Sequence, residues 1–327
     1  MRRARVPLGV PPDTPTRRMN PASVPLVEGR IVKAQSGFFT VESEEGRFIC
    51  HLRGRLKQKR LATDVAAVGD RVRIRRASDG TARIEEVSPR QSVLSRRSPR
   101  QEARKPGPEQ VLVANPDQTL FVFACAEPSP HLRMLDRFLI AAERFHLPAL
   151  VCANKIDLVG RPEAETLFER YRAAGYPVLY TSAQSGEGVE QVREALCDKL
   201  TVLSGPSGAG KSSLLNRLCP GLGLRVSRIS RATSKGRHTT VVPEIFALDF
   251  GGYVADTPGL KAMALWDVGP EDLEEYFPEM RPFLGGCAFN NCTHDTEPGC
   301  LVKEAVLQGR IHPERYDSYL RLRRGQP

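Results

Sequence analysis

A glycine-rich run ending in lysine and serine has the spacing of a phosphate-binding loop, G-x-x-x-x-G-K-S. Its glycines let backbone N–H groups converge on an anion at the start of a helix, where the helix dipole favours negative charge. We expect Lys211 to reach the β- and γ-phosphates as a catalytic group, and the Ser212 hydroxyl to bind Mg²⁺. The predicted phosphate site comprises Gly205, Pro206, Ser207, Gly208, Ala209, Gly210, Lys211, Ser212 and the adjoining Ser213. The alternative is a glycine-rich turn that binds nothing.

Two further short motifs could recognise a guanine base. They are N-K-x-D, formed by Asn154, Lys155, Ile156 and Asp157, and T-S-A, in which Ser182 and Ala183 are assigned to the site. The Asp157 carboxylate can accept hydrogen bonds from N1–H and the N2 amino group of guanine, whereas adenine offers neither donor. Sites of this kind discriminate by about 10⁴–10⁵. N-K-x-D alone recurs by chance, but the Ala183 N–H can complete recognition at guanine O6, so the pair predicts guanine specificity.

A D-x-x-G motif, Asp256 to Gly259, follows a short apolar run. At this position Asp256 would hold Mg²⁺ through water, and the Gly259 N–H would sense the γ-phosphate. The polar run 234–240 lies between the two phosphate motifs and suits a loop ordered by the nucleotide. Thr240, or alternatively Thr239, could supply a second protein ligand to Mg²⁺. The predicted Mg²⁺ set is therefore Ser212, Thr240 and Asp256.

Three of the eight cysteines cluster near the C-terminus with a histidine. The cluster consists of Cys287, Cys292, His294 and Cys300. Four nitrogen and sulfur ligands suit tetrahedral Zn²⁺, and the lack of an open position predicts a structural site. The segment has few apolar residues, so metal binding would supply much of its folding free energy. The alternative is three unpaired thiols and a surface histidine; the other five cysteines lie in apolar contexts and are expected to be buried.

The elements that must position these motifs alternate between strands and helices from about residue 119 onward. Apolar runs at 119–123, 149–153, 200–203 and 253–255 predict buried strands, and a helix is expected at 212–218 directly after the phosphate-binding loop. A stripe of Leu135, Phe138, Leu139, Ala142 and Phe145 predicts an amphipathic helix. This alternation is typical of an α/β domain with a mostly parallel sheet. Helices are expected at 271–277, 303–308 and 313–324 around the cysteine cluster.

The region before residue 98 has a different pattern. Short apolar runs at 31–32, 38–41, 48–52, 72–74 and 82–87 predict five strands of a small barrel such as an OB-fold. In the run 71–75, Val72 and Ile74 should point inward while three arginines share the outer face, an arrangement that suits RNA backbone contacts. Phe38, Phe39 and Phe48 could stack on bases or form barrel core. Residues 1–20 are expected to be a disordered basic arm, and 91–117 a basic linker.

Charge and composition narrow the class of protein. The chain has 327 residues, 40% hydrophobic and 26% charged, with a net charge of +10, which is consistent with two or three globular domains. Residues 1–110 hold 24 Lys+Arg against 12 Asp+Glu, so all excess positive charge lies in the first third and favours a nucleic-acid partner over a merely solvated surface. No apolar run approaches the roughly 18 residues of a membrane span, and no secretory signal is evident. We expect a cytoplasmic protein, beginning at Met1 or Met19.

The order of the motifs carries a resemblance. N-K-x-D and T-S-A precede the phosphate-binding loop and D-x-x-G, whereas a Ras-like GTPase has them last. With this order, the basic barrel and the Cys/His cluster, the chain resembles the circularly permuted GTPases, and among them the ribosome small subunit-dependent GTPase A family. The resemblance implies an OB-fold over 21–98, a permuted α/β P-loop GTPase domain over 99–262 and an α-helical zinc-binding domain over 263–327.

The resemblance also implies an activity and partners. It implies a bacterial GTP hydrolase that uses GTP/GDP, Mg²⁺ and one structural Zn²⁺. Its partners would be the 30S subunit with its 16S rRNA and other assembly factors; the subunit would stimulate hydrolysis, which promotes release. We expect a monomer that contacts no membrane. The alternatives are a GTP-gated RNA-binding checkpoint with negligible hydrolysis, and a permuted GTPase serving the large subunit.

One departure from Ras-like enzymes concerns the attacking water. Leu260 follows Gly259, where those enzymes place the glutamine that orients water. A leucine cannot do this, so intrinsic hydrolysis should be slow. His238 in the 234–240 run is the predicted catalytic replacement; the alternative is an ordinary exposed histidine in a mobile loop.

Overall fold

The computed structural model describes residues 25–54, 64–77, 81–97, 109–222, 244–256 and 268–326. The side chains at positions 96, 97, 109 and 256 are not among the described ones. The predicted arm 1–20 and the run 234–240, with His238, Thr239 and Thr240, lie outside these ranges, as do Gly259 and Leu260.

The N-terminal strands close into the predicted small barrel. Its strands are β1 (Val27–Gln35), β2 (Phe38–Ser43), β3 (Gly46–Leu52), β4 (Arg71–Arg76) and β5 (Ala82–Val87). They follow the order β1-β2-β3-β5-β4, and a pairing between β1 and β4 closes the ring. All neighbours are antiparallel except β3 and β5, which run parallel. This is the connectivity of an OB-fold barrel.

The barrel core and its outer face follow the alternation along β4. Val72 and Ile74 are buried in the core cluster, as predicted. The arginines between them lie on the outer face, but Arg73 pairs with Glu86 and Arg75 lies 3.6 Å from Glu85. The outer face is therefore less positive than its arginines alone indicate. Of the phenylalanines, Phe39 is buried in the core, Phe48 packs against it and Phe38 is half exposed.

The segment 91–117, which we expected to be a basic linker, contains two strands. It contains β6 (Val93–Arg97) and β7 (Glu109–Ala114), which pair as an antiparallel two-stranded sheet. Leu94 and Val113 face each other across this pair and are buried. The four consecutive apolar residues at 111–114, all buried, explain the strand β7; the basic and proline-rich sequence around them favoured a linker instead.

The central domain is a sheet of five parallel strands with an antiparallel edge. The strands are β8 (Gln118–Ala124), β9 (Ala149–Asn154), β10 (Val178–Thr181), β11 (Leu200–Ser204), β12 (Glu244–Ala247) and β13 (Tyr253–Asp256). Their order is β10-β9-β8-β11-β13-β12, and only β12 runs antiparallel to its neighbour within this domain. The parallel register brings the carboxyl ends of these strands to one edge of the sheet, where ligands bind in open α/β sheets.

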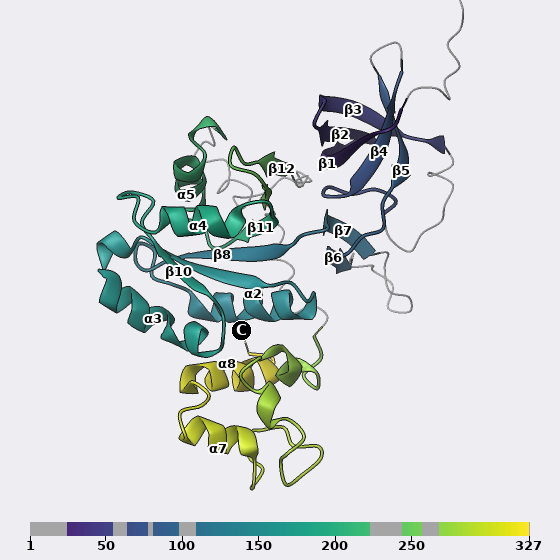
Figure 1. The fold of residues 1–327 in the computed structure, drawn as a ribbon. Helices are drawn as coiled ribbons and strands as arrows, with labels where there is room; N and C mark the ends of the chain where they lie inside the picture. Colours follow the sequence, from purple (N-terminus) through teal and green to yellow (C-terminus); the bar gives the residue numbers. More distant parts are fainter. Residues whose placement is uncertain are drawn as a thin grey trace, which may run out of the picture.

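Helices cover both faces of this sheet (Figure 1). One face packs against α2 (Leu132–Arg144) and α3 (Arg161–Ala173), and the other against α4 (Val189–Leu196) and α5 (Lys211–Leu218). Phe138 and Leu139 of α2 are fully buried, which confirms the predicted amphipathic stripe. Short 3₁₀ turns occupy Ile156–Leu158 and Pro220–Leu222.

The barrel and the central sheet are joined edge to edge. Lys33 of β1 pairs with Glu244 of β12 in antiparallel register, so the described strands of both domains form one 11-stranded sheet. The side chains of these two residues also form an ion pair at 3.4 Å. Arg30 of β1 lies over the ring of Tyr253 on β13, 5.1 Å from its centroid.

The C-terminal region packs as a small helical unit below α2 and α3 (Figure 1). It contains α7 (Leu301–Leu307), α8 (Pro313–Arg323) and 3₁₀ turns at Leu273–Tyr276 and Arg281–Phe283. The last two predicted helices are confirmed. The segment 271–277 forms only a short 3₁₀ turn, which ends where Pro278 favours an extended conformation of Phe277. Among the described helices, none is long and apolar enough to cross a bilayer.

A buried arginine fastens this unit to α2. Arg315 of α8 is inaccessible to solvent and donates to Asp136 of α2 at 2.7 Å and to Glu279 at 2.6 Å. Burial alone would lower its pKa, but these two carboxylates hold the pKa of Arg315 above its ordinary value. The guanidinium also lies over the ring of Phe277, 4.6 Å from its centroid.

Replacing Arg315 by leucine is expected to lower the free energy of unfolding by about 3–5 kcal/mol, because two carboxylates would stay buried without their partner. Urea unfolding followed by circular dichroism measures this change. Arg281→Leu is the matched control: Arg281 bridges the same interface to Glu143, but its side chain is 48% exposed. Exposed pairs contribute about 0–1 kcal/mol. Equal losses in both variants would contradict the special role of the buried arginine.

Candidate functional site

The phosphate-binding loop connects β11 to α5, as the sequence predicts. Gly210 is the N-cap of α5 and has a φ of 90°. Gly205 approaches β8 so closely that a Cβ atom there would lie 2.0 Å from the carbonyl oxygen of Val122. Lys211 Nζ donates to the carbonyl oxygens of Gly205 and Pro206, at 2.8 Å each. The loop is thus a tight turn around its own lysine, with N–H groups at the start of α5.

The buried side chain of Asn154 holds three motifs together. Its Nδ2 donates to the carbonyl oxygen of Ala209 in the phosphate-binding loop at 2.9 Å. Its Oδ1 accepts from Thr181 Oγ1 at 3.0 Å and from the Ala183 N–H at 3.2 Å. Asn154 is fully buried, so each of these bonds is protected from water. One amide therefore fixes the ends of β9 and β10 relative to the phosphate-binding loop.

The N-K-x-D turn and the neighbouring loops surround this amide. Lys155 adopts a left-handed conformation with a φ of 65°, and its ammonium donates to the carbonyl oxygen of Glu127. Ile156 is buried while Asp157 is exposed. Ser182 is buried, and its Oγ accepts from the Ser185 N–H at 3.0 Å. The turn therefore anchors itself by Ile156 and leaves the Asp157 carboxylate accessible to a ligand.

The structure brings most of the predicted nucleotide residues to one edge of the sheet. Asp256 pairs through its backbone with Leu203 of β11, at the end of the strand that leads into the phosphate-binding loop. Ser212 is buried and Ser213 exposed on the first turn of α5. The predicted positions of His238, Thr240 and Gly259 lie outside the described residues.

Two neighbours of this site were not assigned from the sequence. Thr181 is a hydrogen-bond partner of Asn154, and the loop after β8 places Pro128 and Glu127 beside Gly208 and Lys155. Thr181 could have been assigned from the sequence, because it is the polar residue at the end of the apolar run 178–180. No local pattern marks the loop after β8, because only the tertiary fold brings it there.

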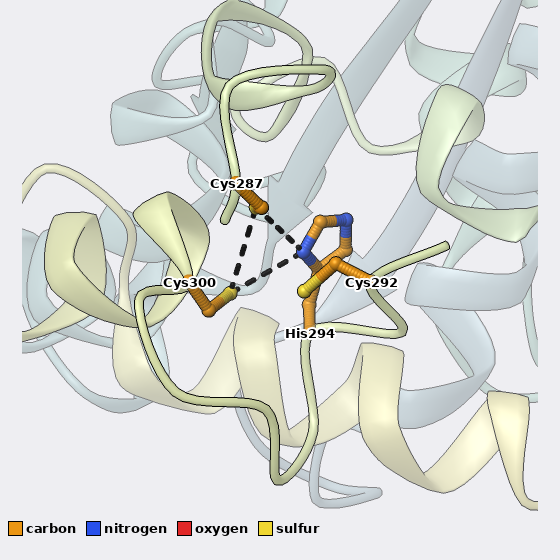
Figure 2. A group of neighbouring side chains, drawn as sticks. All are labelled: Cys287, Cys292, His294 and Cys300. Carbon is orange, nitrogen blue, oxygen red and sulfur yellow. Dashed lines mark hydrogen bonds between the residues drawn. The ribbon is translucent and has the colours of Figure 1, made fainter. Parts of the chain in front are cut away.

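The predicted metal ligands converge in the C-terminal unit (Figure 2). The ligand atoms of Cys287, Cys292, His294 and Cys300 all lie within 4.8 Å of one another. Cys287 Sγ lies 3.6 Å from His294 Nδ1 and 4.0 Å from Cys300 Sγ, and His294 Nδ1 lies 3.3 Å from Cys300 Sγ. Ligands about 2.0–2.3 Å from a tetrahedral Zn²⁺ are separated by about 3.3–3.8 Å. The three thiols and one imidazole therefore fit a structural zinc ion.

Residues around the cluster orient it. The ring of His294 turns Nδ1 toward the cysteines and Nε2 toward Glu274 Oε2, 3.1 Å away, although this contact lacks hydrogen-bond geometry. A carboxylate on the second nitrogen is typical of metal-binding histidines. Tyr316 and Tyr319 of α8 donate to the carbonyl oxygens of His294 and Thr293, at 2.6 and 2.9 Å. The cluster is therefore fastened to α8, which Arg315 fastens to α2.

Burial and hydrogen bonds shift the pKa values of two groups in the ligand loop. Burial raises the pKa of the Cys292 thiol to about 12, so a nearby cation is needed for it to ionise at neutral pH. Hydrogen bonds from Thr293 lower the pKa of Glu297 to about 2, and its carboxylate closes the turn before Cys300. Neither Glu274 nor Glu297 was assigned from the sequence, since an acidic residue carries no spacing signal of its own.

The remaining cysteines are not metal ligands among the described residues. Cys50, Cys125, Cys152 and Cys219 are buried, as expected, but Cys197 is exposed because it ends α4 at the surface. Burial raises the pKa of Cys125 and of Cys152 to about 12, which keeps both as unreactive thiols.

Comparisons with known proteins agree with this geometry. A model of the family described as RsgA GTPase matches residues 87–266, and one described as RsgA N-terminal domain matches residues 28–84. The chain is 47% identical over 298 residues to a "Small ribosomal subunit biogenesis GTPase RsgA" of Gemmatimonas aurantiaca, covering 90% of this chain and 96% of the relative. A relative of the same name from Moorella thermoacetica is 40% identical over 294 residues, covering 90% and 95%.

Two solved structures have the same architecture. YjeQ from Thermotoga maritima matches with a TM-score of 0.74 and 35% identity, covering 92% of this chain and 98% of its own. YloQ, described as a circularly permuted GTPase, matches with a TM-score of 0.70 and 29% identity, covering 96% and 97%. The likeness to both structures therefore extends over nearly the whole chain.

Proposed function

The chain belongs to the RsgA GTPase family, and on that premise we propose that it hydrolyses GTP on the 30S ribosomal subunit late in the maturation of the subunit. Binding to the subunit stimulates hydrolysis, and hydrolysis promotes release. The names of the relatives support a role in the biogenesis of the small ribosomal subunit, since they are called small ribosomal subunit biogenesis GTPases. The single observation that carries the guanine site is the Asn154 side chain, which joins the phosphate-binding loop to the T-S-A loop.

The residues divide the work of binding the nucleotide. Asp157 and the Ala183 N–H read the base, for which the Ala183 N–H leaves its present acceptor, Asn154 Oδ1. Lys155, Ile156 and Ser182 shape the pocket. The loop 205–213 holds the phosphates, and Lys211 leaves the carbonyl oxygens of Gly205 and Pro206 to contact them. Ser212, Asp256 and Thr240 hold Mg²⁺, which offsets phosphate charge when bound. Gly259 senses the γ-phosphate. Cys287, Cys292, His294 and Cys300 hold one zinc ion that stabilises the C-terminal unit.

The domains divide the contacts with the ribosome. We assign 21–98 to RNA binding, 99–262 to the GTPase and 263–327 to the zinc unit, with 1–20 as a basic arm. The barrel and the arm carry the excess positive charge of the chain and suit 16S rRNA. The protein acts in the cytoplasm as a monomer, alongside other small-subunit assembly factors.

The decisive experiment measures hydrolysis of GTP and ATP by the full chain, titrated with mature and immature 30S subunits. GTP turnover that rises with 30S subunits supports the proposal. GTP binding without turnover on any subunit would make the protein a GTP-gated RNA-binding checkpoint with negligible hydrolysis. Stimulation by 50S subunits alone would assign it to the large subunit.

His238→Ala is expected to remove nearly all of the subunit-stimulated hydrolysis and to change GTP affinity by only a few fold. The reason is that Leu260 cannot orient the attacking water, so another group must do so. Stimulated turnover is measured under single-turnover conditions, with His131→Ala on the loop before α2 as the control histidine. Unchanged turnover in the His238 variant would remove this residue from the mechanism.

A further inference from the structure

A half-open pocket lies on the seam between α2 of the GTPase domain and α8 of the C-terminal unit. It is a shallow hollow that opens to solvent, and its lining is rich in arginine. Its polar lining residues are Arg133 and Arg137 of α2, Arg321 of α8, Gln326, and the buried pair Asp136 and Ser318. The pocket lies on the side of the sheet that α2 and α3 cover, and its lining includes no residue of the predicted nucleotide or zinc sites.

The carboxylate in this pocket is already engaged by other groups. Asp136 Oδ1 accepts from Arg315 at 2.7 Å, and Oδ2 accepts from Ser318 Oγ at 2.5 Å. Asp136 is 1% exposed, so it forms part of the floor of the pocket. Arg315 also pairs with Glu279. The buried group of Arg315, Asp136 and Glu279 therefore carries one net negative charge. Arg133 and Arg137, both of the lining, outweigh this charge and leave the pocket positive.

Arg137 provides the strongest indication that the pocket binds a ligand. Its Nε atom is buried and has no hydrogen-bond partner among the residues that the structure describes. Buried donors without a partner are rare in native structures, because they lose their hydrogen bonds to water and gain none in return. Arg133 lies one helical turn away on the same face of α2, and like charges at this spacing repel each other. An anion in the pocket would satisfy the donor and relieve the repulsion together.

We propose that this pocket binds a phosphate group of the RNA backbone and thereby ties the GTPase domain and the zinc unit to one point on the RNA. A guanidinium presents planar paired donors that match phosphate oxygens and stays charged at all physiological pH values. Residues from both domains line the pocket, so binding there stabilises their seam. The inference rests on the proposed function only in taking the ligand to be the RNA of the small subunit.

The test compares single-charge variants in the GDP-loaded full chain, so that the phosphate-binding loop is occupied. Binding to purified 30S subunits and to a uridine dodecamer is measured as a function of salt concentration. Arg137→Gln is expected to weaken both by about tenfold and to reduce the salt slope by about 0.7–0.9. Arg137→Lys should keep most of the slope. Arg172→Gln is the matched control, because Arg172 lies on α3, is 67% exposed and pairs with Glu169.

Each outcome separates the pocket from the proposed function. Identical salt slopes in wild type, Arg137→Gln and Arg172→Gln overturn the inference and indicate a pocket that holds water only. If 30S subunits do not bind the wild type but the dodecamer does so through Arg137, the pocket stands and the proposed function fails. If Arg137→Gln unfolds, the exposed Arg133→Gln replaces it in the same comparison. Inorganic phosphate is also added as a competitor of the dodecamer. If it displaces the dodecamer from the wild type and from Arg137→Gln at the same concentration, the pocket does not bind phosphate and the inference is overturned.

Discussion

Replacing Asp157 by asparagine is expected to lower the affinity for GTP by about 10³–10⁴-fold and to raise the affinity for XTP. A carboxylate accepts hydrogen bonds from guanine N1–H and the N2 amino group, and an amide in its place would face the amino group with a donor. Xanthine carries a carbonyl oxygen at that position, which accepts from the asparagine amide. Asp157 is exposed on its 3₁₀ turn, so the substitution leaves packing intact.

Equilibrium titration with labelled GTP, ATP and XTP measures this exchange. Glu163→Gln is the matched control, since Glu163 is another exposed carboxylate on the first turn of the following helix, α3. The control should bind GTP like the wild type. An Asp157→Asn variant with unchanged GTP affinity would show that the base is recognised elsewhere, and the guanine assignment would then be wrong.

Removing the zinc ion, or replacing Cys300 by alanine, is expected to unfold the C-terminal unit while the central domain stays folded. Structural zinc contributes about 10–16 kcal/mol in zinc-finger peptides, far more than a small unit can gain from its apolar core. Cys300 has two roles, because its sulfur also caps α7 by accepting from the Lys303 N–H at 3.5 Å. Loss of this residue therefore removes a metal ligand and a helix cap together.

Hydrogen exchange read separately over 268–326 and 109–222 distinguishes local from global unfolding. Elemental analysis should give one zinc ion per chain in the wild type and none in Cys300→Ala. Cys197→Ala, which removes an exposed thiol outside the cluster, should keep its zinc and its protection. Full protection of 268–326 after chelation would mean that the unit is held by its packing on α2 alone.

Local chemistry explains why much of the fold could be predicted. The phosphate-binding loop follows β11 and precedes α5 because its glycines adopt conformations that other residues avoid, with a φ of 81° at Gly208 and 90° at Gly210. The barrel strands and the stripe of α2 follow from alternation and helical periodicity. The four metal ligands were found because their residue types are rare and closely spaced.

Where the predictions were wrong, local patterns competed with each other. The basic and proline-rich sequence around β6 and β7 favoured a linker over strands. The 3₁₀ turn at Leu273–Tyr276 is shorter than the predicted helix and ends at the extended Phe277, directly before Pro278. The outer arginines of β4 were located correctly, but their glutamate partners come from β5. The register in which two strands pair decides which charged side chains lie opposite each other. The alternation of residues within one strand does not determine this register.

The amino-acid order alone thus specifies the chemistry of each motif: which residues can bind phosphate, a base or a metal, and in which local turn. The tertiary structure alone decides which motifs meet. Asn154 joins loops that are distant in the chain, Arg315 finds Asp136 on another domain, and an arginine pocket forms where α2 and α8 touch. These contacts depend on close packing between faces whose residues have no fixed separation in sequence, so no spacing rule can encode them.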